Sequence, residues 1–221
     1  MRNRRHICVV SLLFDAKPEG ICTGRLVRAL LSAGHRITLI TSSKAKLGLS
    51  HPQLSTHVYS VTPKEPRSIF NAWAAARGEI ANNFYVWSKR VAQHEWAKNE
   101  QPDMIYGRGW PHASLVAAYQ LAKQSGLPLA LHFSDPFPAP NEPALTPRFT
   151  LGLNRMVARA KVITFTNQET IDYQRQHLAI AAKMVAIPHV TLPQQCFLSD
   201  APATHFYYCL LYTSDAADDV A

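Results

Sequence analysis

Short apolar runs alternate with amphipathic stretches along most of this 221-residue chain. Runs rich in Val, Ile, Leu and Phe lie near residues 7–13, 37–41, 56–61, 103–106, 129–133, 161–165 and 184–187. The run "ICVVSLLF" that begins at Ile7 is apolar at nearly every position, which is typical of a parallel strand covered on both faces. These runs predict the strands of a buried parallel sheet.

Helical periodicity fills the intervals between these runs. Apolar residues at spacings of three and four predict helices near residues 23–33, 112–126 and 168–178, and another that ends near residue 160. Gly34 and Gly126 follow two of them, as capping glycines do. Residues 68–99 carry one aromatic-rich stripe, for which core packing is favoured over a lipid-facing or acceptor-facing surface: Ile69, Trp73, Ala76, Ile80, Phe84, Trp87 and Val91.

The alternation of strands and helices predicts a Rossmann-like, doubly wound α/β fold. In such folds ligands bind outside the carboxyl ends of the strands. The candidate site residues are therefore those that follow the strands, namely 15–20, 41–43, 106–108, 132–135 and 166–168. One of these loops continues through "DPFPAPNEPALTP", whose five prolines in 13 residues exclude a helix or a central strand.

Composition changes this picture little. Hydrophobic residues make up 47% of the chain, which excludes a disordered protein, and no apolar run approaches the roughly 18 residues that span a bilayer. The basic start "MRNRR" before an apolar run is similar to a signal peptide. That run is short and no small-residue cleavage site follows it, so a first strand is the favoured interpretation.

The formal net charge of +8 favours an anionic partner, such as a nucleotide diphosphate, an acidic lipid or a nucleic acid. Lys and Arg are spread along the chain, apart from Arg2, Arg4 and Arg5, which argues against a nucleic-acid-binding face. The spacing of the four cysteines suits neither zinc nor a disulfide framework: Cys8, Cys22, Cys196 and Cys209. We expect a buried Cys8, no metal site and a cytoplasmic setting.

Gly20 follows the first strand and precedes the first predicted helix. The segment "EGICTG" lacks the GxGxxG dinucleotide motif, and the chain has no GxxxxGK[ST] phosphate-binding loop. A glycine at this place serves either a tight turn or the close approach of a phosphate to backbone N–H groups at a helix N-terminus.

Five segments, in order, resemble the N-terminal domain of family 4 glycosyltransferases of the GT-B fold. They are "PEGICTGRLVRALLSAGHRITLIT", "PDMIYGRG", "GLPLALHFSDPFP", "ARAKVITFTNQETIDY" and "KMVAIPHV", and the likeness covers about residues 6–193. Residues of the first segment match the family pattern "LAxxLxxxGHxVxVxT" in order: Leu26, Leu30, Gly34, His35, Ile37, Leu39 and Thr41. The chain departs from the family in its single-glycine loop and at His189, where the family has Asn.

The resemblance implies that residues 1–193 are the acceptor-side half of a retaining glycosyltransferase. Such an enzyme moves a sugar from a nucleotide-sugar to an acceptor hydroxyl, here a glycan or a lipid-linked acceptor, without a metal or other cofactor. Residues 194–208 would lead into a donor-binding domain, and residues 209–221 resemble a non-native tail. This half alone is expected to be inactive, and a peripheral contact with an anionic membrane is a further expectation.

Two alternatives stay open, a stand-alone α/β binding domain without catalysis and a sugar epimerase of the GT-B fold. For catalysis, Asp135 is a candidate base or else a turn cap, and His132 is a candidate catalytic group or else a core histidine. Arg108 would bind an anion unless it is a solvated loop residue. The remaining candidates would contact the donor: Gly20, Ile21 and Asn167, the last also expected to cap a helix.

Overall fold

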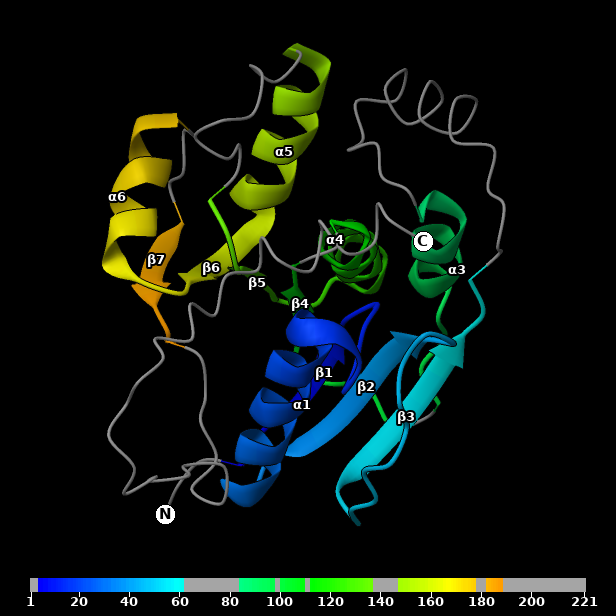
Figure 1. Cartoon of the computed structure of the whole chain (residues 1–221). Coiled ribbons are helices and arrows are strands. Elements are labelled where there is room, and N and C mark those ends of the chain that lie inside the picture. The colour runs from blue at the N-terminus through cyan, green and yellow to red at the C-terminus, as the bar shows by residue number, and fades with distance from the viewer. Residues whose placement is uncertain are drawn as a thin grey trace, which may run out of the picture. The chain divides into compact units, whose positions relative to one another are not determined.

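The computed structural model describes residues 4–61, 84–97, 100–109, 112–136, 147–177 and 182–188. Within them, one parallel sheet contains β1 (His6–Val10), β2 (Arg36–Ser42), β3 (Leu54–Tyr59), β4 (Met104–Arg108), β5 (Leu129–Phe133), β6 (Ala160–Phe165) and β7 (Lys183–Ala186). The strand order is β3-β2-β1-β4-β5-β6-β7 (Figure 1). The predicted Rossmann-like α/β fold is confirmed.

Helices cover both faces of this sheet. In the described part of the chain they are α1 (Lys17–Ser32), α3 (Tyr85–Ala92), α4 (Ala113–Ser125), α5 (Pro147–Arg159) and α6 (Gln168–His177). The connection through α1 runs from β1 to one side of the sheet, whereas the connection through α4 runs from β4 to the other side. Right-handed crossovers therefore place α1 and α4 on opposite faces, which makes the sheet doubly wound.

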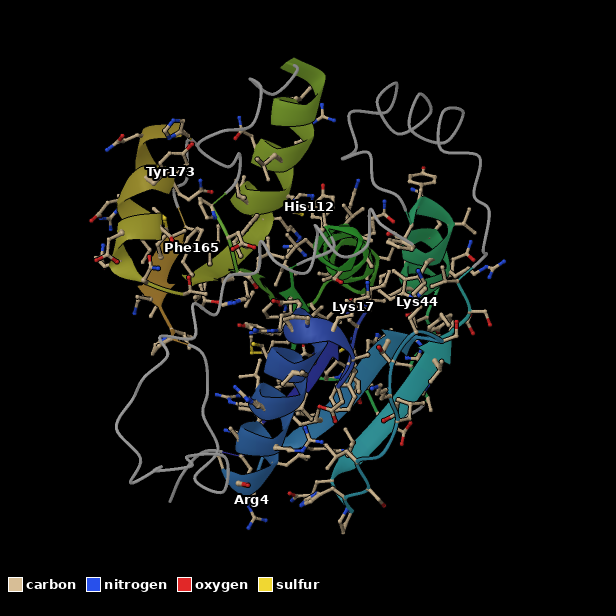
Figure 2. The ribbon with its side chains drawn as sticks, in the orientation of Figure 1. Arg4, Lys17, Lys44, His112, Phe165 and Tyr173 are labelled. Carbon is tan, nitrogen blue, oxygen red and sulfur yellow. The ribbon has the colours of Figure 1, made fainter. Side chains whose placement is uncertain are left out.

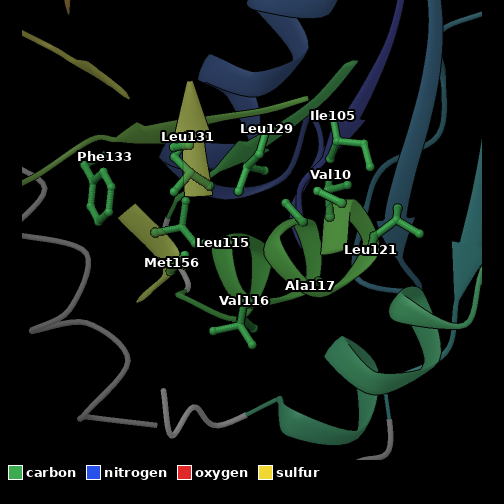
Figure 3. Packing of buried hydrophobic residues seen from close by; sticks show 14 of the residues in the cluster. Val10, Ile105, Leu115, Val116, Ala117, Leu121, Leu129, Leu131, Phe133 and Met156 are labelled. Carbon is green, nitrogen blue, oxygen red and sulfur yellow. The ribbon is translucent and has the colours of Figure 1, made fainter. Parts of the chain in front are cut away.

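The face that α4 and α5 cover holds the larger apolar cluster. Leu129, Leu131 and Phe133 of β5 contribute to it at alternate positions (Figure 3). Gly107 lets α4 approach β4 closely, because a Cβ at this position would lie 2.5 Å from the Cβ of Ala118. Each large side chain buried here contributes about 1.5–3 kcal/mol. This face therefore supplies much of the stability of the domain.

The first strand is shorter than predicted. β1 ends at Val10, although residues 11–14 remain buried. Side chains replace strand pairing there: the Leu12 N–H donates to Ser114 Oγ (2.9 Å), and Ser42 Oγ donates to the Leu12 carbonyl (2.6 Å). An apolar run reports burial rather than hydrogen bonding, so it did not distinguish this buried loop from a strand.

The helix boundaries are partly as predicted. α1 begins at Lys17, six residues before the predicted start, with Pro18 in its first turn. Gly34 (φ 86°) and Gly126 (φ 72°) follow α1 and α4 in the left-handed conformation, as the capping prediction requires. α3 ends at Ala92, seven residues before the end of the predicted helical segment.

The aromatic stripe is confirmed as core packing where it is described. Trp87 and Val91 of α3 have no exposed surface and belong to the larger cluster, and Phe84 packs against it. The other members of the stripe lie outside the described residues: Ile69, Trp73, Ala76 and Ile80. Most of the proline-rich loop, from residue 137 to 146, and the predicted tail at 209–221 also lie outside them.

Candidate active site

The order of the strands reverses between β1 and β4, and such a switch point is where doubly wound sheets bind their ligands. β1 and β4 are paired neighbours, with Val10 opposite Gly107. The edge at their carboxyl ends also holds the start of α1. Figure 2 shows Lys17, the first residue of α1, at one end of the helix and Arg4, which precedes β1, near its other end. Side chains from α1, β4 and the loop after β5 meet at this edge.

A buried carboxylate occupies the centre of this edge. Glu19, in the first turn of α1, is 3% exposed, and Ser134, just after β5, donates a hydrogen bond to its Oε2 (2.8 Å). Arg108, the last residue of β4, is 4% exposed, with its Nε 3.1 Å from Glu19 Oε1. The pair is in ionic contact without the alignment of a hydrogen bond. Arg108 is therefore not the solvated loop residue that was its alternative.

Burial raises the pKa of Glu19 from its ordinary value near 4.5 to about 7. The positive charge of Arg108 and the hydrogen bond from Ser134 lower this pKa, and the negative charge of Asp135 raises it further. Desolvation is the largest of these effects, so the carboxyl gains and loses its proton near neutral pH. A group poised in this way can exchange a proton when the charge around it changes.

A second group of polar side chains lies on the same face of the sheet, one step deeper. The Thr164 hydroxyl of β6 is 2.9 Å from His132 Nδ1 of β5 and 3.1 Å from the Tyr106 hydroxyl of β4. It also donates to the Leu131 carbonyl at 3.3 Å. His132 is 2% exposed. This arrangement matches the interpretation of His132 as a buried, hydrogen-bonded histidine rather than a group at the surface.

Gly20 lies inside the first turn of α1 rather than before the helix, and it is buried. A Cβ there would lie 3.1 Å from the backbone nitrogen of Phe14 and 3.2 Å from the carbonyl carbon of Leu13. The Asp15 N–H donates to the Gly20 carbonyl at 2.8 Å. The close approach at Gly20 is thus made by the chain's own loop, and Ile21 beside it is 41% exposed.

The connection between β1 and α1 has a strained backbone and is held in place by an ion pair. Asp15 (φ 49°) and Lys17 (φ 58°) adopt the left-handed conformation, which is costly for residues other than glycine. The Arg28 guanidinium donates two hydrogen bonds to the Asp15 carboxylate. Gly24 makes room for this pair, since a Cβ there would collide with the Asp15 carboxylate. Strain of this kind is common beside functional sites.

Two further predicted residues follow β5 and β6. Asp135 is exposed and close enough to Glu19 to raise its pKa. Asn167 Oδ1 accepts hydrogen bonds from the Thr170 N–H (2.7 Å) and the Thr170 hydroxyl (2.8 Å), which confirms its predicted role as the cap of α6. The carbonyl end of the Asn167 side chain is therefore already engaged.

The structure brings Arg108 and Asp135 together around Glu19 and places His132 deeper, against Thr164. Sequence reasoning included Glu19 in the candidate loop at residues 15–20 but did not single it out, because an acidic residue in the first turn of a helix is ordinary. The signal that would have found it is topological: Glu19 follows β1 and Arg108 ends β4, and these strands are neighbours at the switch point.

Among the described residues, no three His, Cys, Asp or Glu side chains are grouped as metal ligands. Cys8 is buried, as predicted. None of the helices described is long and apolar enough to cross a membrane.

Known proteins place this geometry in context. The family model described as "Glycosyl transferase 4-like domain" matches residues 20–189. A search of curated proteins finds no match. Among solved structures, sucrose-phosphate synthase from Thermosynechococcus elongatus is similar with a TM-score of 0.56 at 16% identity, over 84% of this chain and 48% of that one.

Phytolacca americana UGT2 is similar with a TM-score of 0.51 at 12% identity, over 88% of this chain and 56% of that one. At such identities the likeness shows the fold alone, and the chain spans about half the length of these structures. The family match, by contrast, covers most of the chain. It begins at Gly20, directly after Glu19, and includes Arg108 and His132. The chain therefore belongs to the glycosyltransferase 4-like family, with the Rossmann-like half of a GT-B fold.

Proposed function

We propose that the chain is the acceptor-side half of a glycosyltransferase that moves a sugar from a nucleotide-sugar to an acceptor hydroxyl with retention of configuration. The observation that carries the proposal is the buried Glu19–Arg108 pair at the switch point of a glycosyltransferase 4-like domain. A buried ion pair is a poor source of stability, and perturbed carboxyl groups gather at functional sites. The similar UGT2 structure is complexed with UDP-2fluoro-glucose and pterostilbene, which supports a nucleotide-sugar as the donor class.

In the transfer, the bond between the anomeric carbon and the diphosphate oxygen breaks and a bond to the acceptor oxygen forms. The acceptor hydroxyl gives its proton to Asp135, and negative charge develops on the departing diphosphate. Arg108 is the residue we assign to that anion, because a guanidinium keeps its charge at neutral pH. Glu19 takes up a proton as the anion replaces it beside Arg108. Donor binding therefore strengthens as the pH falls from about 8 to 6.

The remaining residues have supporting roles in this proposal. Asp135, the exposed carboxylate at the same edge, accepts the hydrogen bond of the acceptor hydroxyl. His132 positions the carboxyl end of β5 through Thr164. Gly20 keeps the loop at residues 13–14 against α1, so that the neighbourhood of Ile21 faces the donor. The amide nitrogen of Asn167 is the part of that side chain left for a donor contact.

The partner and setting extend the same proposal. A net charge of +8 suits an anionic donor and an acceptor presented at an anionic surface. The acceptor we propose is a glycan or a lipid-linked sugar in the cytoplasm, with residues beyond 193 leading into the donor-binding half. Co-sedimentation with anionic vesicles, compared with neutral ones, tests the membrane contact.

The polypeptide encoded by the whole gene tests the reaction. We expect it to consume a nucleotide-sugar only with an acceptor present and to give a product with the donor's anomeric configuration, read by NMR. Inversion would overturn retention. An epimerised sugar without transfer would favour an epimerase, and no turnover together with a gene that ends near residue 208 would favour a binding domain.

The 221-residue chain alone tests whether tight donor binding requires the donor-binding half of the protein. We expect it to bind UDP-glucose no better than about millimolar, because a helix terminus supplies only about 1–2 kcal/mol and the single Arg108 about as much again. In the whole protein, Gly20→Val should weaken donor use, since its branched side chain meets the backbone at residues 13–14. Gly48→Val is the matched control, because a Cβ at Gly48 meets nothing within 4 Å. Micromolar binding by the chain alone, or equal behaviour of the two variants, would contradict these expectations.

A further inference from the structure

A pocket of about 400 Å³ lies at the edge of the sheet opposite the candidate active site. Gln101 precedes β4, and Gln124 and Ser125 end α4, so the pocket is at the amino ends of the strands. Its volume is within the usual range of small-molecule sites. The lining residues are His94, Glu95, Trp96, Ala97, Gln101, Leu121, Gln124 and Ser125.

One wall of the pocket is a fixed stack of aromatic rings. The His94 ring packs edge-on against His57 (4.6 Å between centroids) and Trp96 (4.5 Å). The Tyr59 hydroxyl is 2.7 Å from His94 Nδ1, and the Ser55 hydroxyl is 3.3 Å from His57 Nε2. α3, which leads into this wall, lies beside β3 (Figure 1). The wall is therefore organised before any ligand arrives.

The pocket carries little positive charge. Burial, together with the charge of His57, lowers the pKa of His94 to about 4, so its imidazole is neutral at pH 7. Of the lining residues that the structure describes, Glu95 alone is formally charged, and the nearby Arg36 and Glu100 pair with each other. Among the described lining residues, a phosphate or carboxylate ligand would find no cation.

The polar groups of the lining both donate and accept hydrogen bonds. Gln101 and Gln124 each present a carboxamide, and Ser125 a hydroxyl. Trp96 adds an indole N–H that is shielded from solvent and has no hydrogen-bond acceptor among the described residues. Because Trp96 lines the pocket, a ligand that brings an acceptor can satisfy this donor.

We propose that this pocket binds a neutral carbohydrate, as a second site that is separate from the site of transfer. A pyranose offers an apolar face to the aromatic wall and hydroxyl groups that can donate to and accept from Gln101, Gln124 and Ser125. The same hydroxyl groups can donate to the Glu95 carboxylate. A lipid tail would need a more apolar lining, and an anion would need a cation. The proposal goes beyond the transfer reaction and does not depend on it.

Indole N–H resonances of the ¹⁵N-labelled chain test the proposal, with maltotriose and methyl α-glucoside as probes. We expect the Trp96 resonance, assigned with Trp96→Phe, to shift saturably with a millimolar dissociation constant. The Trp87 resonance is the internal control, because Trp87 is fully buried outside the pocket. Gln124→Leu should weaken binding at least fivefold while the Trp87 resonance stays in place. Gln101→Leu serves in the same way if Gln124→Leu disturbs the fold.

Other outcomes overturn the proposal. They are a Trp96 resonance that neither sugar moves, a shift that both glutamine variants leave unchanged, and a response to inorganic phosphate or spermidine in place of sugars. UDP is expected to leave Trp96 unmoved, which separates this site from the proposed donor site. A failure of the transfer reaction would therefore leave this test intact.

Discussion

Two arginine–glutamate ion pairs of equal length lie at opposite edges of the sheet. Arg108 Nε and Glu19 Oε1 are 3.1 Å apart at the carboxyl edge, and Arg36 Nη2 and Glu100 Oε1 are 3.1 Å apart at the amino edge. The first two side chains are 5% and 3% exposed, and the second two are 45% and 47% exposed. Distance alone would rank the pairs as equal, whereas their solvation separates them.

The exposed pair keeps most of its hydration and is screened by salt, so it contributes at most about 1 kcal/mol. The buried pair has lost its hydration, and the raised pKa of Glu19 shows that Arg108 does not fully offset that loss. This pair stabilises the fold poorly and lies at the carboxyl ends of β1 and β4, where doubly wound sheets bind ligands. A role in ligand binding therefore explains it better than a role in stability.

Charge reversal should give the largest difference in stability between the two ion pairs. Glu19→Lys would bury a second cation beside Arg108, and we expect a loss of more than about 4 kcal/mol in the free energy of unfolding. Glu100→Lys, the matched change at the exposed pair, should cost less than about 1 kcal/mol. Urea denaturation of the two variants measures both, and equal losses would show that the buried pair is not buried in solution.

The pH dependence of stability is the next largest effect. Because folding raises the pKa of Glu19 to about 7, its contribution is complete below pH 4.5 and is lost as the pH rises through 7. Relative to Glu19→Gln, the wild-type chain should lose about 3 kcal/mol between pH 4.5 and 8, since one pKa unit is about 1.4 kcal/mol. Glu100→Gln is the matched control variant at the exposed pair. Parallel profiles for wild type and Glu19→Gln would refute the shift.

A smaller loss of stability is expected when the hydrogen bonds of Thr164 are removed. Thr164→Val removes the hydroxyl between His132 and Tyr106, and we expect a loss of about 1–2 kcal/mol. Thr56→Val on β3 is the control, since Thr56 is exposed. In a double-mutant cycle with Tyr106→Phe, the two losses should not add. Additive losses would mean that Tyr106 and Thr164 act independently.

The smallest effect belongs to the exposed pair itself. Arg36→Met should change the free energy of unfolding by less than about 0.5 kcal/mol at 0.15 M salt, and by less still at 1 M. Thermal denaturation at both salt concentrations measures it. A loss comparable with that of Glu19→Lys would remove the contrast between the two edges.

The parallel sheet and its helices could be predicted because burial leaves apolar runs and helical spacing in the sequence. The loop at residues 11–14 could not be separated from a strand, since it is equally apolar and is held by Ser42 and Ser114 from elsewhere in the chain. The start of α1 was misplaced because the residues of its first turn lack an apolar stripe.

The candidate site was only half predictable. Arg108 and Asp135 follow strands and could be found from topology, and Asn167 precedes a helix as a cap does. Glu19 lay within the candidate loop at residues 15–20, but its pairing with Arg108 became visible only when β1 and β4 proved to be neighbours, because the two residues are 89 positions apart. The pocket at the amino ends of the strands combines residues that follow α3, Gln101 before β4, and residues of α4, with His57 of β3 packed behind His94, so it has no local signature in the sequence.

The central claim is that the buried arginine at the switch point binds the donor anion, whereas its exposed counterpart does not. The direct test is kcat/KM for the nucleotide-sugar in the protein encoded by the whole gene, with Arg108→Met compared with Arg36→Met. We predict a loss of about 10- to 100-fold for Arg108→Met, since a charge-assisted hydrogen bond is worth about 1.5–3 kcal/mol. Arg36→Met should stay within about twofold of the wild type. Equal values for the two variants would contradict the claim.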